Sequence, residues 1–419
     1  MIVNSWMDAL DNRTDLRLAR TSGASNHGSS VDRDLSPTHL PAQHGDRPAE
    51  RDAPIALLLP SLAGGGAERM TINLARGLAE RDLHVDLVLG HADGPYRNLV
   101  PDKVRPIDLR RRQMIATLGP LVRYLRRERP RALIAAMNHA SIVALWAARL
   151  AGTKTPIYAS VRSQLSVEAH RSPLLGDRMM PLLARAFFPW ARAVIAVSAG
   201  VADDLRSRVG LDPGLIRVIH NPVVTPDLAL LAAESPAHPW LADPVVPVIL
   251  GAGRLTEQKD FATLIRAFAL VQAVRPCRLV ILGEGPERAA LEDLAQRLGL
   301  GDAVSLPGFQ PNPFAFMRAA SLFVLSSAWE GLPGVLIQAM ACGTPVVSTD
   351  CPSGPREILG TEAAALGPLV PVGDSSELAR AILDTLAKPP TTDVLQRRAA
   401  DFSMTAIAGR YLDLLGTGT

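Results

Sequence analysis

A carboxylate, two glycines and an amide follow one another closely in the second half of the chain. Glu330 ends an apolar run, Gly331 and Gly334 follow it, and Gln338 lies within a predicted helix. The first N–H groups of a helix have no partner inside the helix and attract anions. Carboxylate and amide side chains can hold sugar hydroxyls. We therefore expect a site that holds a sugar, a phosphate and a ribose together.

The alternative interpretation makes Glu330 and Gly331 an ordinary loop and Gln338 a solvated helix residue. Gln338, however, interrupts the otherwise apolar run 335–341. A helix that is apolar nearly all round is expected to be buried, so a polar residue within it needs a specific partner. The binding interpretation is therefore favoured.

A second candidate site is the run of three glycines at 64–66, where a predicted strand at Ile55–Leu59 passes into a predicted helix. Glycines there let backbone N–H groups approach an anion at the helix N-terminus. A tight turn is the simpler alternative. The loop is not a P-loop, because no Gly-Lys-Ser/Thr follows it. Nor is it a dinucleotide fingerprint, because Arg69 stands where a glycine is needed.

Two cations, Arg254 and Lys259, follow the first predicted strand of the second half. Charges on a solvated surface are the alternative, but a lysine at the start of a helix opposes the helix dipole. Paired cations suit a diphosphate. The glycine pairs at 251–253 and 283–285 are incomplete as dinucleotide motifs, which argues against a nicotinamide or flavin enzyme.

No metal site is expected. The only Asp-x-Asp sequence is Asp32-Arg33-Asp34, and it lies in a polar tail that we predict to be disordered. Cations and helix ends would then stabilise a leaving diphosphate without a divalent ion. The three cysteines, at positions 277, 342 and 351, form no Cys-x-x-Cys pair, so neither a disulfide framework nor a cysteine zinc site is expected.

The composition indicates a folded protein of two domains. The chain has 419 residues, of which 47% are hydrophobic and 20% charged, and domains usually span about 100–200 residues. Residues 54–221 carry 24 Lys/Arg and 13 Asp/Glu, a net charge of +11, whereas residues 222–419 carry 14 and 20, a net charge of −6. The first half is therefore expected to meet something anionic. We find no long apolar run or secretory signal, so a cytoplasmic location is expected.

Short apolar strands alternate with helical patterns along residues 54–402, as in parallel sheets covered on both faces. In the first half we expect strands at 55–59, 84–89, 104–107, 132–136, 156–161 and 193–197. In the second half we expect strands at 246–250, 278–282, 304–306, 322–325 and 345–348. The fold class is thus α/β, with two doubly wound domains at 54–221 and 222–402 whose ligands bind in the cleft between them. Residues 1–53 are expected to be a disordered tail, and 403–419 a helix that packs back on the first domain.

A basic segment runs from Arg110 to Arg131 and holds eight arginines with apolar residues between them. It predicts a basic amphipathic helix, which suits an anionic membrane surface or simply a solvated face. Nucleic acid is not expected as a partner, because Tyr124 is the only aromatic residue in the segment.

With these motifs in this order, the sequence resembles retaining glycosyltransferases of family 4, which have the GT-B fold of two Rossmann-like domains facing a cleft. The resemblance covers residues 54–415 and rests on GGGAER, GAGR with a later lysine, GEGPER, and WEGLPGVLIQAMACGTPVVSTD. The segments SVRSQLS and CPSGPREIL resemble members that extend lipid-linked or lipopolysaccharide oligosaccharides. The resemblance places the acceptor on the first domain and the nucleotide sugar on the second.

The same resemblance implies roles for individual residues. Arg254 and Lys259 would neutralise the donor diphosphate, and Glu330 would bind the transferred sugar. The remaining donor-binding residues that it implies are Gly65, Gly66, Arg162, Gly253, Glu284, Phe309, Gly331, Gly334, Val335, Leu336 and Gln338.

The sequence departs from the family pattern at two positions. The second glutamate of the E-x7-E pattern is Gln338, which can still bind a ribose hydroxyl but without a charge-assisted bond. Arg162 stands where many members have a histidine; His139 could take the catalytic role of that histidine, or it could be a structural residue.

We therefore expect a peripheral enzyme on the inner face of the cytoplasmic membrane. It would transfer a hexose or N-acetylhexosamine, with retention and without a metal cofactor, from a UDP-sugar to a lipid-linked saccharide or a lipopolysaccharide or exopolysaccharide precursor. A nucleotide-sugar 2-epimerase of similar fold and a non-catalytic nucleotide-sugar-binding protein are the alternatives.

Overall fold

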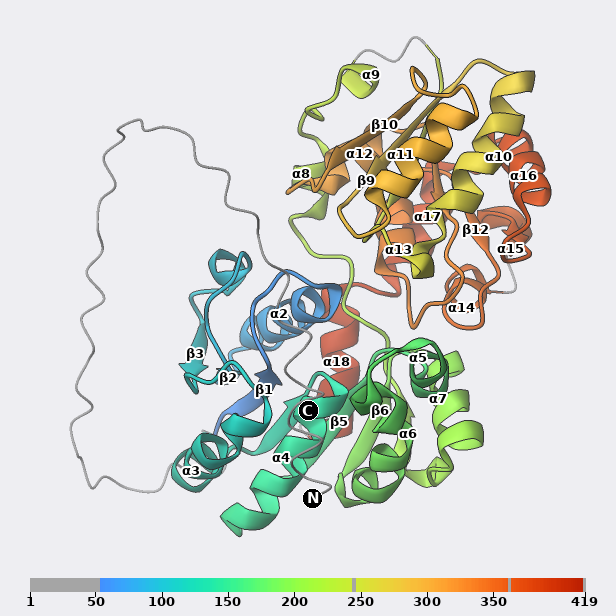
Figure 1. The fold of residues 1–419 in the computed structure, drawn as a ribbon. Helices are drawn as coiled ribbons and strands as arrows, with labels where there is room; N and C mark the ends of the chain where they lie inside the picture. Colours follow the sequence, from blue (N-terminus) through green and yellow to red (C-terminus); the bar gives the residue numbers. More distant parts are fainter. Residues whose placement is uncertain (1–52, 243–245, 361–362, 417–419) are drawn as a thin grey trace, which may run out of the picture.

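The computed structural model describes residues 53–242, 246–360 and 363–416. Two α/β domains stand one above the other in Figure 1. The sequence prediction of a disordered tail falls on residues 1–53, nearly all of which lie outside the described residues.

The N-terminal domain is built on a parallel sheet of seven strands in the order β3-β2-β1-β4-β5-β6-β7. The strands are β1 (Ile55–Leu59), β2 (Val85–Leu89), β3 (Val104–Asp108), β4 (Ala132–Ala135), β5 (Ile157–Val161), β6 (Ala193–Ala196) and β7 (Ile216–Val218). Strands β1, β2, β4, β5 and β6 are buried along their whole length, as expected for a sheet covered on both faces.

Helices cover both faces of this sheet: α2 (Gly66–Ala79), α3 (Leu118–Glu128), α4 (Asn138–Ala151), α5 (Leu165–Arg171), α6 (Leu175–Phe187) and α7 (Ala199–Asp204). Alternate residues of β1 point to opposite faces. Ile55, Leu57 and Leu59 pack with α2 on one face of the sheet. Leu58 packs on the other face, in a cluster that includes residues of α3, α4 and α6.

The C-terminal domain has a parallel sheet of six strands in the order β10-β9-β8-β11-β12-β13. The strands are β8 (Val248–Ala252), β9 (Arg278–Leu282), β10 (Val304–Gly308), β11 (Leu322–Leu325), β12 (Val346–Thr349) and β13 (Leu369–Val370). The helices are α8 (Leu228–Ala232), α9 (Pro239–Ala242), α10 (Phe261–Val274), α11 (Arg288–Arg297), α12 (Pro313–Ala319), α13 (Gly334–Ala341), α14 (Pro355–Leu359), α15 (Ala363–Leu366), α16 (Ser375–Ala387) and α17 (Thr392–Ala400).

The chain crosses between the domains twice, and the two crossings are hydrogen-bonded to each other. The amides of Val223 and Val224 donate to the carbonyl of Phe402 at 2.9 and 3.1 Å. After the second crossing, helix α18 (Met404–Leu415) packs on α2 of the N-terminal domain. A Cβ at Gly77 of α2 would lie 2.9 Å from Met404, so glycine allows the two helices to approach closely.

Several elements differ from the expectations drawn from the sequence. Strand β8 begins and ends two residues later than the expected strand at 246–250. The proline-rich stretch after Asn221 contains the short helices α8 and α9. Strands β7 and β13 were not among the expected strands. Strand β7 has only three residues and is partly exposed, so it carries almost no pattern.

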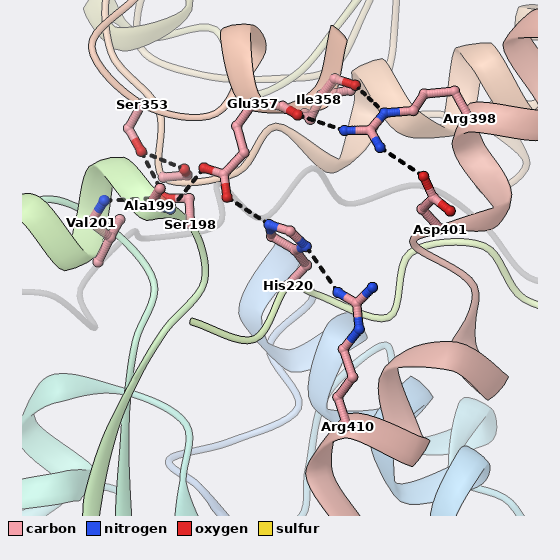
Figure 2. Close-up of polar contacts among 11 residues, drawn as sticks. Ser198, Ala199, Val201, His220, Ser353, Glu357, Ile358, Arg398, Asp401 and Arg410 are labelled. Atoms are coloured by element: carbon pink, nitrogen blue, oxygen red, sulfur yellow. Dashed lines mark hydrogen bonds and ion pairs between the residues drawn. The ribbon is translucent and has the colours of Figure 1, made fainter. Parts of the chain in front are cut away.

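A polar network joins the two domains beside the crossings (Figure 2). The carboxylate of Glu357 in α14 accepts from the amide of Ala199 at 2.7 Å and contacts the His220 ring nitrogen at 2.6 Å. The other ring nitrogen of His220 lies 3.3 Å from the guanidinium of Arg410 in α18. The Glu357 side chain of the C-terminal domain thus contacts the N-terminus of α7 (Ala199) and His220 beside the first crossing.

Candidate active site

A cavity of about 940 Å³ lies between the two domains. Its walls are the loops that follow the carboxyl ends of β1, β4 and β5 on one side and of β8, β10 and β11 on the other. Parallel sheets bind ligands at this end of their strands. Predicted site residues from both domains that line the cavity are Gly66, His139, Arg162, Arg254, Lys259, Phe309, Glu330, Gly331, Gly334, Val335 and Gln338.

Glu330 and Lys259 form an ion pair on the C-terminal wall. The Lys259 ammonium donates to the Glu330 carboxylate, which also accepts from the Ser327 hydroxyl at 2.8 Å. Glu330 is only 7% exposed, so a charge there requires these partners. The backbone of Gly253 allows the pair to form, because a Cβ at that position would lie 3.0 Å from the Lys259 side chain. Gly253 itself does not line the cavity.

Helix α13 begins at Gly334 with its N-terminus at the cavity. No side chain among the described residues caps it. Gly334, Val335 and Gln338 line the cavity, as predicted, but Leu336 does not: its side chain is buried, and its amide donates to the Pro333 carbonyl at 3.1 Å. That amide is therefore engaged in the helix turn.

The close approach of the two walls requires glycine at position 331. A Cβ at Gly331 would lie 1.9 Å from the carbonyl oxygen of Arg162 in the other domain. The guanidinium of Arg162 donates to the Ala136 carbonyl, the Asn221 side chain and the Thr71 hydroxyl at 3.0, 2.8 and 3.1 Å. Burial lowers the pKa of Arg162. Arg162 therefore joins β4, α2 and the first crossing at the cavity wall.

His139 lies in the first turn of α4, on the N-terminal wall. Its ring nitrogen Nε2 is 3.7 Å from the Asp177 oxygen Oδ1. The other oxygen of that carboxylate, Oδ2, accepts from the Ser172 hydroxyl at 2.6 Å. No sequence pattern indicated Asp177, because a lone aspartate in a helical pattern is ordinarily a surface residue.

Two other predicted residues lie at the edges of the site. Phe309 is 62% exposed and lines the cavity, so its ring is open to a planar ligand. Glu284 does not line the cavity. Its carboxylate binds the Arg288 guanidinium at 2.9 and 2.7 Å, which holds the pKa of Glu284 below its usual value.

In the glycine loop, Gly66 lines the cavity and Gly65 does not. Gly65 is the N-cap of α2, and a Cβ there would lie 2.4 Å from a carboxylate oxygen of Glu68. Glu68 therefore folds back on the start of its own helix. A carboxylate at this position satisfies the positive helix end that was expected to meet a phosphate.

A contact across the cavity was not predicted. The guanidinium of Arg171 in α5 lies 4.2 Å from the centre of the Trp329 ring and 2.6 Å from the Glu257 carboxylate. Trp329 directly precedes Glu330 in the sequence, and this position was the one indication that Trp329 lies at the site. Arg254, by contrast, is exposed and forms no ion pair with the residues that the structure describes.

Comparison with known proteins agrees with this architecture. The family model described as Glycosyltransferase Family 4 matches residues 64–226, and the model described as Glycosyl transferases group 1 matches residues 240–402. The lipopolysaccharide core biosynthesis glycosyltransferase LpsE of Rhizobium meliloti is 32% identical over an alignment of 366 residues that covers 84% of this chain and 96% of that protein.

Of two further similar proteins, one aligns with a smaller part of this chain and the other has a lower sequence identity. The N-acetylgalactosamine-N,N'-diacetylbacillosaminyl-diphospho-undecaprenol 4-alpha-N-acetylgalactosaminyltransferase of Campylobacter jejuni is 32% identical over 55% of this chain and 60% of its own length. The fold is that of Anabaena HepE, solved in complex with UDP-glucose, with a TM-score of 0.71 at 24% identity over 87% of this chain and 99% of that one. The chain therefore belongs to the family 4 glycosyltransferases of the GT-B fold.

Proposed function

We propose that this glycosyltransferase moves a sugar from a UDP-sugar to a lipid-linked or lipopolysaccharide precursor. The observation that carries the proposal is the Glu330–Lys259 pair beside the N-terminus of α13, in a cavity shared by both domains. The carboxylate suits the hydroxyls of the transferred sugar, and the ammonium and helix end suit the diphosphate. Gln338, one turn into α13, would bind the ribose, and Phe309 would stack on the nucleobase.

In the proposed reaction, the glycosidic C–O bond to the diphosphate breaks as the acceptor oxygen bonds to the same face of the sugar carbon. Negative charge develops on the leaving diphosphate, where Arg254, Lys259 and the α13 N-terminus stabilise it. The leaving phosphate takes the proton of the acceptor hydroxyl. This front-side displacement retains the anomeric configuration and requires neither a metal ion nor a side-chain nucleophile.

The acceptor would bind against the N-terminal wall, where His139 and Asp177 offer hydrogen-bonding groups. Support for a lipid-linked or lipopolysaccharide acceptor comes from the names of the relatives in Rhizobium and Campylobacter. Such an acceptor would place the enzyme on the inner face of the cytoplasmic membrane, at an anionic surface. None of the described helices is long and apolar enough to span a membrane.

The amphipathic helix predicted in the basic segment corresponds to α3, whose apolar face packs on the protein and not on a membrane. In α3, Leu121, Tyr124 and Leu125 are buried in the core of the domain. Arg126 donates to the carbonyls of Leu150 and Ala151 at the end of α4. The apolar face of α3 is therefore occupied by the fold, and only its exposed arginines can meet an anionic surface.

A screen of UDP- and GDP-sugars for protection against thermal unfolding tests the donor, because a ligand that binds only the folded state raises the melting temperature. We expect a UDP-sugar to protect, and the same sugar to be transferred to a lipid-linked acceptor. Turnover of the UDP-sugar without acceptor would indicate an epimerase. Protection without either transfer or slow hydrolysis would indicate a binding protein.

A further inference from the structure

Two neighbouring helices of the N-terminal domain expose large apolar side chains to solvent. Helix α4 exposes Trp146 and Leu150, and α6 exposes Leu175, Met179 and Leu182, the last at 61%. The α6 residues are spaced four and three apart and therefore share one helix face. Helices α4 and α6 pack against each other, and Figure 1 shows them on the same side of the N-terminal sheet. We call these five side chains the α4/α6 face.

Charge on these helices is of one sign at the surface. Arg149, Arg178 and Arg185 are exposed, and the guanidinium of Arg149 lies 3.7 Å from the centre of the Trp190 ring. The only acidic residue on either helix is Asp177, which is buried toward the cavity. Exposed apolar side chains ringed by arginines without exposed acids complement a bilayer with anionic headgroups, because arginine stems lie along apolar surface while their heads reach phosphate.

The opposite side of α6 belongs to the active site. Asp177 and Met180 line the cavity, whereas Leu175, Met179 and Leu182 point away from it. One helix, about 10 Å across, therefore separates the cavity from the α4/α6 face. A lipid-linked saccharide anchored at that face would have only this short distance to cover.

We propose that the α4/α6 face docks on an anionic lipid bilayer and that the arginines of α3 only assist it. The proposal rests on the proposed function in one respect, the lipid-linked acceptor. Vesicle binding and sugar transfer are measured separately, so either can fail alone.

The test is sedimentation of the full chain with vesicles of phosphatidylcholine, alone or mixed with phosphatidylglycerol. We expect salt-sensitive binding to the mixed vesicles. The triple variant Leu175→Gln, Met179→Gln, Leu182→Gln should lower the partition coefficient at least about tenfold. Glutamine retains good helix propensity. The matched control Leu270→Gln, Val274→Gln changes exposed apolar residues of α10 in the other domain and should bind like wild type.

A second pair of variants separates this face from α3. Arg178→Glu with Arg185→Glu should weaken vesicle binding more than Arg123→Glu with Arg127→Glu, and neither should change UDP-sugar protection. Wild-type vesicle binding by the glutamine variant, or loss only in the α3 variant, would overturn the proposal. Absence of vesicle binding by the wild-type protein would also overturn it. A glutamine variant that is altered only in self-association would overturn it as well, and would assign the face to a second copy of the chain.

Discussion

The side-chain oxygens of Ser198 and Ser353 lie 2.8 Å apart, one in each domain (Figure 2). Ser198 is the N-cap of α7 and accepts from the amide of Val201 at 3.2 Å. Ser353 donates to the carbonyl of Gly331 at 2.8 Å, and Gly331 directly follows Glu330. One buried hydroxyl thus connects a helix N-terminus of the N-terminal domain to the loop that carries the candidate sugar-binding carboxylate.

Replacing Ser353 with alanine should lower kcat/KM for the donor about tenfold, because the loop that carries Glu330 would lose this hydrogen bond. A buried hydrogen-bonding group left without its partner costs about 1–3 kcal/mol of stability. The measurement is steady-state transfer together with the melting temperature. Ser376→Ala, at an exposed position in α16, is the matched control. Wild-type kinetics in a folded Ser353→Ala variant would show that this contact does not position the loop.

Glu330→Ala should remove most transfer activity while the protein stays folded, because Glu330 lies at the cavity and not in an apolar core. Loss of a charge-assisted contact that strengthens in the transition state costs about 2–4 kcal/mol, or about 30- to 1000-fold in rate. Asp293→Asn on the surface of α11 controls for removal of a carboxylate from an ion pair. Unchanged turnover in the Glu330 variant would refute the site.

Gln338→Glu should remain active, because both side chains can accept a hydrogen bond from a ribose hydroxyl. Gln338→Leu should raise the donor KM instead, since the hydroxyl would lose its partner. Donor saturation curves distinguish the two variants. A neutral effect of leucine would mean that Gln338 does not face the donor, even though it lines the cavity.

Transfer should persist in EDTA, because Arg254, Lys259 and the α13 N-terminus are proposed to stabilise the leaving diphosphate. Initial rates before and after chelation provide the measurement, with a metal-dependent glycosyltransferase treated in parallel. Complete loss of activity that magnesium or manganese restores would contradict the metal-free mechanism.

The order of strands and helices was largely predictable, since buried parallel strands are short continuous apolar runs bounded by glycine and proline. The segment from Glu330 to Gln338 was predictable for the same reason: a strand end, two glycines and an amide in an apolar helix are local signals. The sequence by itself thus determined the fold class, the family and the stretch from Glu330 to Gln338 on the C-terminal wall, although the predicted Gly253, Glu284 and Leu336 do not line the cavity.

Only the tertiary structure decided which groups meet across the domains. The pairing of Arg171 with Trp329 and the contact of Ser353 with Ser198 join residues more than 150 positions apart, and no local pattern encodes such pairs. Burial was decided in the same way. Leu121 and Leu125 of α3 are buried in the core, whereas Leu175, Met179 and Leu182 of α6 are exposed. Amphipathic spacing shows that a helix has an apolar face but not which neighbour covers it.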